Sequence, residues 1–101
     1  MIKKRYLKTK PECKVYFKLP KKETGNADKV SLVGDFNDWD PEANPMKKLS
    51  NGDFSLTINL TKDQDYQFKY YVDGSEWIND EDADKLAPTP FPDTKNSVLS
   101  I

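Results

Sequence analysis

The alternation of apolar and polar residues limits the fold of this chain more than any other feature. Two segments carry an apolar residue at every second position: Phe54, Leu56, Ile58 and Leu60, and then Tyr66, Phe68, Tyr70 and Val72. This period is that of a β-strand with one buried and one solvated face. Lys69 falls between the apolar positions of the second segment and is expected to point outward. No segment sustains helical spacing, so the predicted class is all-β.

Shorter strand signals and turns complete the pattern. Strands are predicted at 14–19, at 30–33 and, as the closing strand, at 98–101, with turns at Asn51-Gly52 and Asp73-Gly74. Residues 21–29 are predicted to form a loop, and the acidic and then proline-rich residues 79–95 an extended surface loop. In a chain of 101 residues this predicts one domain, an immunoglobulin-like antiparallel β-sandwich.

Charge is unevenly distributed along the chain. The net charge of −1 gives no reason to expect nucleic acid or a membrane as the partner. Residues 1–22, however, hold nine of the sixteen basic residues and one acidic residue, Glu12. We therefore divide the chain into a basic N-terminal segment, residues 1–11, expected to be a solvated arm, and a β-sandwich domain, residues 12–101.

Cysteine use and hydropathy indicate the compartment. Cys13 is the one cysteine, so no internal disulfide can form, and a buried structural thiol is the expected role. Lysines interrupt the first ten residues, and no apolar stretch is long enough for a signal peptide or a membrane span. A cytoplasmic location is expected.

The residue types present argue against an enzyme. The chain has no histidine, which excludes histidine-based catalytic triads and histidine metal sites. Paired carboxylates that could serve a glycosidase also need a cleft that holds and distorts a sugar, which a domain of this size rarely supplies. Asp80, Asp82 and Asp84 are spaced like the start of a calcium loop, but Lys85 stands where glycine is required. We predict no catalytic residue, no metal and no cofactor.

Aromatic and polar residues at turns and on outward strand faces are the candidate binding residues. Trp39 follows Phe36-Asn37-Asp38 in a turn-forming stretch, and Trp77 follows the Asp73-Gly74 turn. Each indole is either exposed or folded inward as a lid on the core. If both are exposed, the CH-rich face of a sugar ring can pack on them while Lys69, Thr94 and Asn96 bond to its hydroxyl groups.

Several motifs occur together in one order, and the longest is Gly34-Asp35-Phe36-Asn37-Asp38-Trp39. The others are Val30-Ser31-Leu32-Val33, Met46, Gly52-Asp53-Phe54, Tyr70-Tyr71-Val72-Asp73-Gly74, Trp77 and Asn96-Ser97-Val98. In this combination the chain resembles carbohydrate-binding module family 48 over residues 13–101. That family includes the glycogen-binding domain of the AMP-activated protein kinase β subunit and the early-set domains of isoamylases and glycogen branching enzymes.

The resemblance implies a sandwich of the early-set type and non-catalytic binding of α-glucans such as glycogen, starch or maltooligosaccharides. It places the sugar site on five residues: Trp39, Lys69, Trp77, Thr94 and Asn96. Tyr71 either extends the tryptophan platform or packs under the loops. The chain departs from the family at Pro92, where the kinase domain has a leucine that reaches into the glucan, and at Glu76, which is expected to lengthen the turn before Trp77.

Two alternatives stay open. The chain can be a protein-interaction or regulatory module with the same fold, whose basic segment docks on a glucan-metabolising enzyme or a kinase. It can also be a domain without a ligand, in which Trp39 and Trp77 pack inward.

Overall fold

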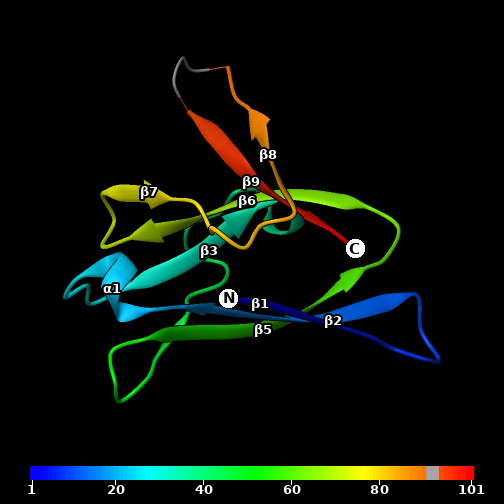
Figure 1. Ribbon diagram of the computed structural model, residues 1–101, viewed down its shortest axis with the longest axis horizontal. Coiled ribbons are helices and arrows are strands. Elements are labelled where there is room, and N and C mark those ends of the chain that lie inside the picture. Colours follow the sequence, from blue (N-terminus) through cyan, green and yellow to red (C-terminus); the bar gives the residue numbers. More distant parts are fainter. Residues whose placement is uncertain (91–93) are drawn as a thin grey trace.

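The computed structural model describes residues 1–90 and 94–101 as two antiparallel sheets packed face to face (Figure 1). The first sheet has the order β1 (Ile2–Tyr6), β2 (Glu12–Leu19), β5 (Phe54–Thr61) and β4 (Lys47–Lys48). The second has the order β3 (Val30–Gly34), β6 (Asp65–Val72), β9 (Lys95–Ser100) and β8 (Lys85–Pro88), and β7 (Glu76–Ile78) pairs with β6. The predicted all-β, immunoglobulin-like sandwich is confirmed.

The core forms from the strand faces that the alternation predicts. Val15, Phe17 and Leu19 of β2 are buried, as are the apolar positions of β6. Phe68 stands between the sheets, with its ring 5.5 Å from that of Phe17 on β2 in an edge-to-face arrangement. Such pairs add about 0.5–1.5 kcal/mol beyond the area that they bury. Cys13 is also fully buried, in agreement with a structural thiol.

The predicted turns are confirmed, and the predicted loops are confirmed only in part. Asn51-Gly52 joins β4 to β5 and Asp73-Gly74 joins β6 to β7. The predicted loop at 21–29 contains a short helix, α1 (Lys21–Thr24), and a second short helix, η1 (Asp35–Asn37), follows β3. The extended loop predicted over 79–95 is wrong in part, because β8 lies within it and pairs with β9. Pro88 argued against a strand here, but an edge strand tolerates proline.

Within the described residues, no helix has the length and apolar character needed to cross a membrane.

The basic N-terminus is a strand rather than a solvated arm. β1 pairs with β2 from Ile2↔Phe17 to Tyr6↔Cys13. Because Phe17 and Cys13 face the core, this register directs Ile2 and Lys4 to the inner side of the sheet, where both are half-buried. The run of charges concealed the strand, since the partner of Lys4 lies eighty residues further along the chain.

Lys4 ties the two sheets together at their edge. Its Nζ donates to Asp84 Oδ2 at 2.7 Å and to the Ser100 carbonyl at 2.8 Å, and Ser100 N donates to the same carboxylate oxygen. Burial acts to raise the pKa of Asp84, but the hydrogen bonds from Lys4 and Ser100 outweigh it and lower this pKa below the usual 3.8. The contribution to stability is therefore present above pH 3.8 and is lost as the pH falls through the lowered pKa.

Substitution of Lys4→Met is expected to lower the free energy of unfolding at pH 7 by about 1 kcal/mol or less, because the pair is partly screened by solvent. The difference from the parent should shrink as the pH falls through the lowered pKa of Asp84, since the carboxyl group is then protonated in both proteins. Urea unfolding of both proteins at a series of pH values measures this difference in free energy. Lys3→Met, on the outer face of the same strand, is the matched control. Equal losses of unfolding free energy in the two variants at pH 7 would show that the bonds from Lys4 to Asp84 and Ser100 do not stabilise the fold.

Candidate functional site

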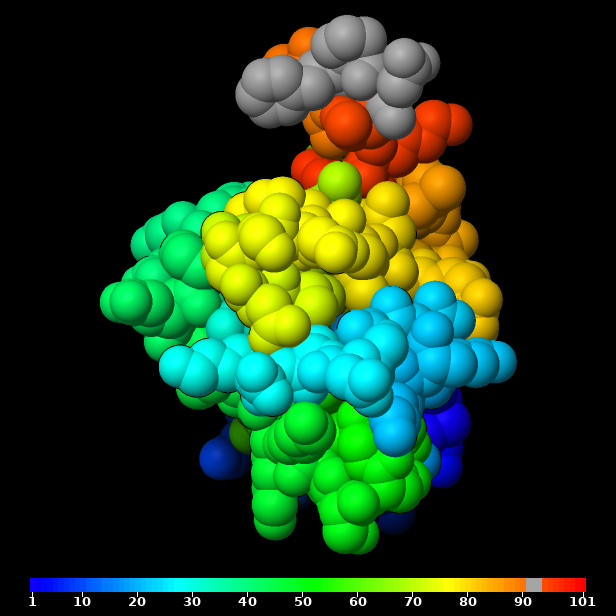
Figure 2. Space-filling view, turned by 90° about the vertical axis from the view of Figure 1, so that its left-hand side faces the viewer, coloured from blue at the N-terminus to red at the C-terminus, as the bar shows by residue number. Residues whose placement is uncertain are grey.

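The five predicted site residues lie together. They line one groove of about 540 Å³, which we call the main groove, with Trp39, Lys69, Trp77, Thr89, Pro90, Thr94 and Asn96 as its described lining residues. Three segments meet beside it: the loop after β3, the β6–β7 hairpin and the β8–β9 hairpin. Figure 2 shows them as the green, yellow and orange-to-red parts of one face. The site therefore spans residues far apart in the sequence.

Lys69 and Trp77 are positioned by the second sheet. Phe68 and Tyr70 point into the core, so Lys69 between them points outward, as predicted. Among the described residues, Lys69 Nζ has no hydrogen bond or ion pair, which leaves its three donors for a ligand. The β6–β7 hairpin places Trp77 directly opposite Tyr71, one strand away.

Trp77 rests on Tyr71. The two rings stack with centroids 4.2 Å apart and planes 29° from parallel, and Trp77 remains 46% exposed. Tyr71 donates its hydroxyl to the Gly74 carbonyl at 2.5 Å, which fixes the ring beneath the indole. Trp77 is therefore not a lid on the core, and Tyr71 supports it from below.

Trp39 is held by Asp35. One carboxylate oxygen accepts the indole N–H of Trp39 at 2.9 Å, and the other accepts the backbone N–H of Gln67 on β6 at 2.7 Å. Gly34 allows this close approach, because a Cβ there would lie 2.5 Å from the Gln67 carbonyl oxygen. Trp39 is half-buried and lies outside the core cluster, with one side on the main groove.

The turn before Trp39 is unusual in its backbone. Asp38 and Trp39 both have φ of 57°, a region that residues other than glycine seldom adopt and that bulky residues avoid. Asn37 stabilises the turn: its amide accepts the Gly34 N–H and donates to the Leu32 carbonyl. Strain of this kind persists only where the surroundings enforce it, and it concentrates at functional sites.

The start of β9 is fixed by a polar network. Asn79, just after β7, accepts from Ser97 N at 3.0 Å and donates to the Lys95 carbonyl at 2.9 Å. Asn96, between these two, turns to the outer face and donates to Gln67 Oε1 at 3.0 Å. Thr94 forms a short hydroxyl contact with Thr89, across from it on the chain that follows β8.

The sequence analysis missed the residues that support the site. Asp35, Asn37 and Asn79 act by positioning others, and Thr89 and Pro90 add to the lining. Asp35 and Asn37 were visible as part of the motif before Trp39 but had no assigned contact. Glu76 lies in β7, opposite Val72, rather than in the turn. Pro92 lies outside the described residues.

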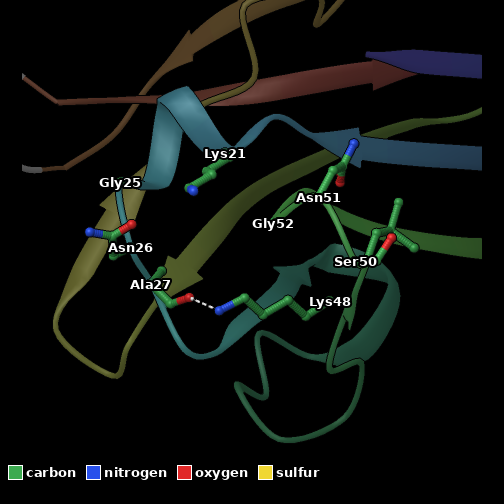
Figure 3. Close-up of a pocket in the computed structure, with 9 residues that line it drawn as sticks. Lys21, Gly25, Asn26, Ala27, Lys48, Ser50, Asn51 and Gly52 are labelled. Carbon is green, nitrogen blue, oxygen red and sulfur yellow. Dashed lines mark hydrogen bonds between the residues drawn. The ribbon is translucent and has the colours of Figure 1, made fainter.

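A second cavity, of about 230 Å³, lies away from these residues, between the loop after α1 and the turn before β5 (Figure 3). Lys48 reaches across it and donates to the Ala27 carbonyl at 3.0 Å. Lys21 lies on the opposite side and packs on Gly52, where an added Cβ would be 2.7 Å from its side chain. Both lysines thus connect turns, and neither belongs to the predicted site.

The lining of the main groove suits a neutral ligand with apolar and polar faces. Two indoles and a proline offer flat CH- and π-rich surfaces, and hydroxyl and amide groups lie between them. Lys69 is the one ionisable group among the described lining residues. Sites for small molecules commonly combine aromatic walls with a few polar groups in this way.

Comparison with known proteins gives a consistent result. The sequence model of carbohydrate-binding module 48 (isoamylase N-terminal domain) matches residues 24–89, which include Trp39, Lys69 and Trp77. Thr94 and Asn96 lie beyond the matched range.

Curated relatives include 1,4-alpha-glucan branching enzymes from three organisms. That of Protochlamydia amoebophila (strain UWE25) is 32% identical over 75% of this chain, and that of Aquifex aeolicus (strain VF5) is 34% identical over 65%. That of Prochlorococcus marinus (strain MIT 9301) is 38% identical over 46%. The matched regions cover 11%, 10% and 6% of those enzymes, so the chain spans about a tenth of their length or less. With the family model matching more than half of its residues, the chain belongs to carbohydrate-binding module family 48.

Proposed function

We propose that this domain binds α-glucan chains, such as glycogen, starch or maltooligosaccharides, and does not itself catalyse a reaction on them. Trp39 and Trp77 form the platform for the sugar rings, and Lys69, Thr94 and Asn96 bond to the hydroxyl groups. The observation that carries the proposal is the convergence of two indoles and three polar side chains from three separate segments on one groove. The α-glucan as ligand is supported by the names of the relatives, which act on 1,4-α-glucan.

The energetics predict weak binding to short chains. A sugar hydroxyl exchanges hydrogen bonds with water for hydrogen bonds with protein, at a net gain of about 0.5–1.5 kcal/mol each. Packing on the indoles adds a hydrophobic contribution in proportion to the area covered. A branched polymer presents many equivalent chain ends, so several copies of the domain on one particle would be retained more strongly than one copy on a free oligosaccharide.

Calorimetric titration with maltoheptaose and with β-cyclodextrin tests the proposal. Trp39→Ala and Trp77→Ala are each expected to weaken binding at least about tenfold, because each removes an aromatic contact of about 1.5–3 kcal/mol. Tyr6→Ala is the matched control, since Tyr6 is an aromatic residue 52% exposed on β1 in the other sheet. Circular dichroism confirms the fold of each variant. A parent protein that neither binds these sugars nor sediments with glycogen would refute the function.

Asp35 provides a second test, through its effect on Trp39. In Asp35→Asn, one oxygen remains to accept from one of the two N–H donors, while the new NH₂ group faces the second donor and cannot accept from it. Trp39 is therefore expected to lose its fixed orientation. In a Trp77→Phe background, Trp39 is the only tryptophan, and its fluorescence should become more accessible to iodide. Maltoheptaose affinity should fall about fivefold, the effect of roughly one lost hydrogen bond. Unchanged quenching alongside unchanged affinity would show that Asp35 does not position the indole.

A second candidate function is favoured by the outer face of the first sheet. Lys3, Arg5, Lys14 and Lys18 share this face, which we call the cationic face. Within residues 1–90 and 94–101, Lys18 alone among them is paired, with Asp53 at 3.6 Å. We propose that it docks the domain on an acidic surface of a glucan-metabolising enzyme or a kinase. Opposite charges of this kind mainly speed association.

The docking candidate is tested by charge removal rather than by deletion, because residues 2–6 form a strand whose loss would expose β2. The triple variant Lys3→Gln, Arg5→Gln and Lys14→Gln should lose co-sedimentation with a purified branching enzyme or kinase while keeping maltoheptaose binding. Added salt should weaken the parent interaction, since exposed charges are screened over about 10 Å at 0.1 M. Equal co-sedimentation of parent and variant would exclude this face.

A further inference from the structure

A second groove lies next to the main groove on the same face of the molecule. It has a volume of about 490 Å³ and separates the loop after Trp39 from the β6–β7 hairpin, the green and yellow parts of Figure 2. We call it the side groove. Its lining includes Lys29, Ser31, Pro41, Glu42, Pro45 and Tyr71.

The two grooves are joined by one pair of stacked rings. Ser31, Tyr71 and Trp77 form a row across the outer face of the second sheet, because Ser31 pairs with Tyr71 and Tyr71 with Trp77. Trp77 lines the main groove and Tyr71 lines the side groove, and their ring centroids are 4.2 Å apart. Because the stacked pair lies between the two grooves, a ligand that passes the edge of the stack moves from the surface of Trp77 to that of Tyr71.

The apolar part of the side groove is formed by the rings of Tyr71 and two prolines. The Tyr71 hydroxyl is already bonded to the Gly74 carbonyl, so the residue offers its ring rather than its hydroxyl group. Pro41 and Pro45 stand nearby on the loop side, and proline rings present CH groups with no conformational freedom to lose. Surfaces of this kind complement the CH-rich faces of a pyranose.

The polar part of the side groove has unused bonding capacity and no net charge. Among the described residues, the side chains of Lys29, Ser31 and Glu42 form no hydrogen bond or ion pair. One cation and one anion balance each other, which favours a neutral ligand over an ion. A carboxylate accepts and an ammonium group donates, so together they match the hydroxyl groups of a sugar.

We propose that the side groove is a second α-glucan subsite, occupied by the continuation of a chain that crosses the Trp77–Tyr71 stack from the main groove. This inference rests on the proposed function of the main groove. It implies that chains long enough to reach both grooves bind more tightly than chains that fill one.

The test compares maltotriose, a short chain expected to fill the main groove first, with maltodecaose. The double variant Lys29→Met and Glu42→Met removes the two charged groups of the side groove and leaves Tyr71, Trp77 and the main groove intact. The control, Lys22→Met with Glu23→Met, makes the same two changes on exposed positions of α1 that line neither groove. Calorimetry gives the affinities, and backbone-amide NMR of the parent locates the contacts.

For the parent, maltodecaose should shift the amide resonances of Ser31 and Glu42 in addition to those around Lys69 and Asn96. The side-groove variant should bind maltodecaose about fivefold more weakly than the parent, as expected for one to two lost hydrogen bonds, and maltotriose equally well. The control should match the parent with both sugars.

Four results would overturn the proposal. If maltodecaose shifts only main-groove resonances, or if the side-groove variant binds it as the parent does, the subsite is refuted while the proposed function stands. If the control loses as much affinity as the variant, the effect is one of general charge and the subsite is refuted. If the parent binds neither sugar, the proposed function fails and the subsite fails with it.

Discussion

The alternation of side chains along β6 is the constraint on which the rest of the structure depends. Its even-numbered residues, among them Phe68 and Tyr70, fill the space between the sheets, and this burial supplies the main stabilisation of a domain of this size. The same backbone geometry forces the residues between them outward. A shift of one residue in the register would exchange the two sets, so the core and the binding face are specified together.

Three outward residues of β6 each organise a different part of the candidate site. Gln67 donates its backbone N–H to Asp35 and accepts from the Asn96 amide through its side-chain oxygen, which fixes the loop of Trp39 and the start of β9 relative to one strand. Lys69 enters the main groove, and Tyr71 supports Trp77 and borders the side groove. Because all three are attached to a central strand of the sheet, the groups of the candidate site are held in place without a ligand. Preorganisation of this kind lowers the entropic cost of binding.

The parts that sequence reasoning could predict are those set by local pattern. Period-two alternation identified β2, β5 and β6, and turn residues identified the hairpin that carries Trp77. β1 and β8 escaped prediction, because a charged residue, Lys4, takes an inward position in β1 and Pro88 ends β8. The partners that allow Lys4 to face inward, Asp84 and Ser100, lie far along the chain, where no local pattern encodes them. The five site residues came from the family resemblance, and their roles in binding stay predictions. The contacts of Asp35 and Asn79 required the structure, since hydrogen-bond geometry cannot be read from residue type.

The backbone conformation of Trp39 explains the roles of the residues in the motif before it. A tryptophan with positive φ costs of the order of 1–3 kcal/mol, and this cost must be offset by neighbouring contacts. Gly34 permits close approach to β6, Asn37 closes the turn with three hydrogen bonds, and Asp35 holds the indole. Each contact acts on the same short loop, so the loss of any one leaves less interaction energy to offset the backbone strain. The turn is thus built to hold one aromatic ring at one orientation beside the groove, at some expense to stability. Trp77 reaches the same groove by a different route, since its hairpin needs only an Asp73-Gly74 turn and the stacked ring of Tyr71.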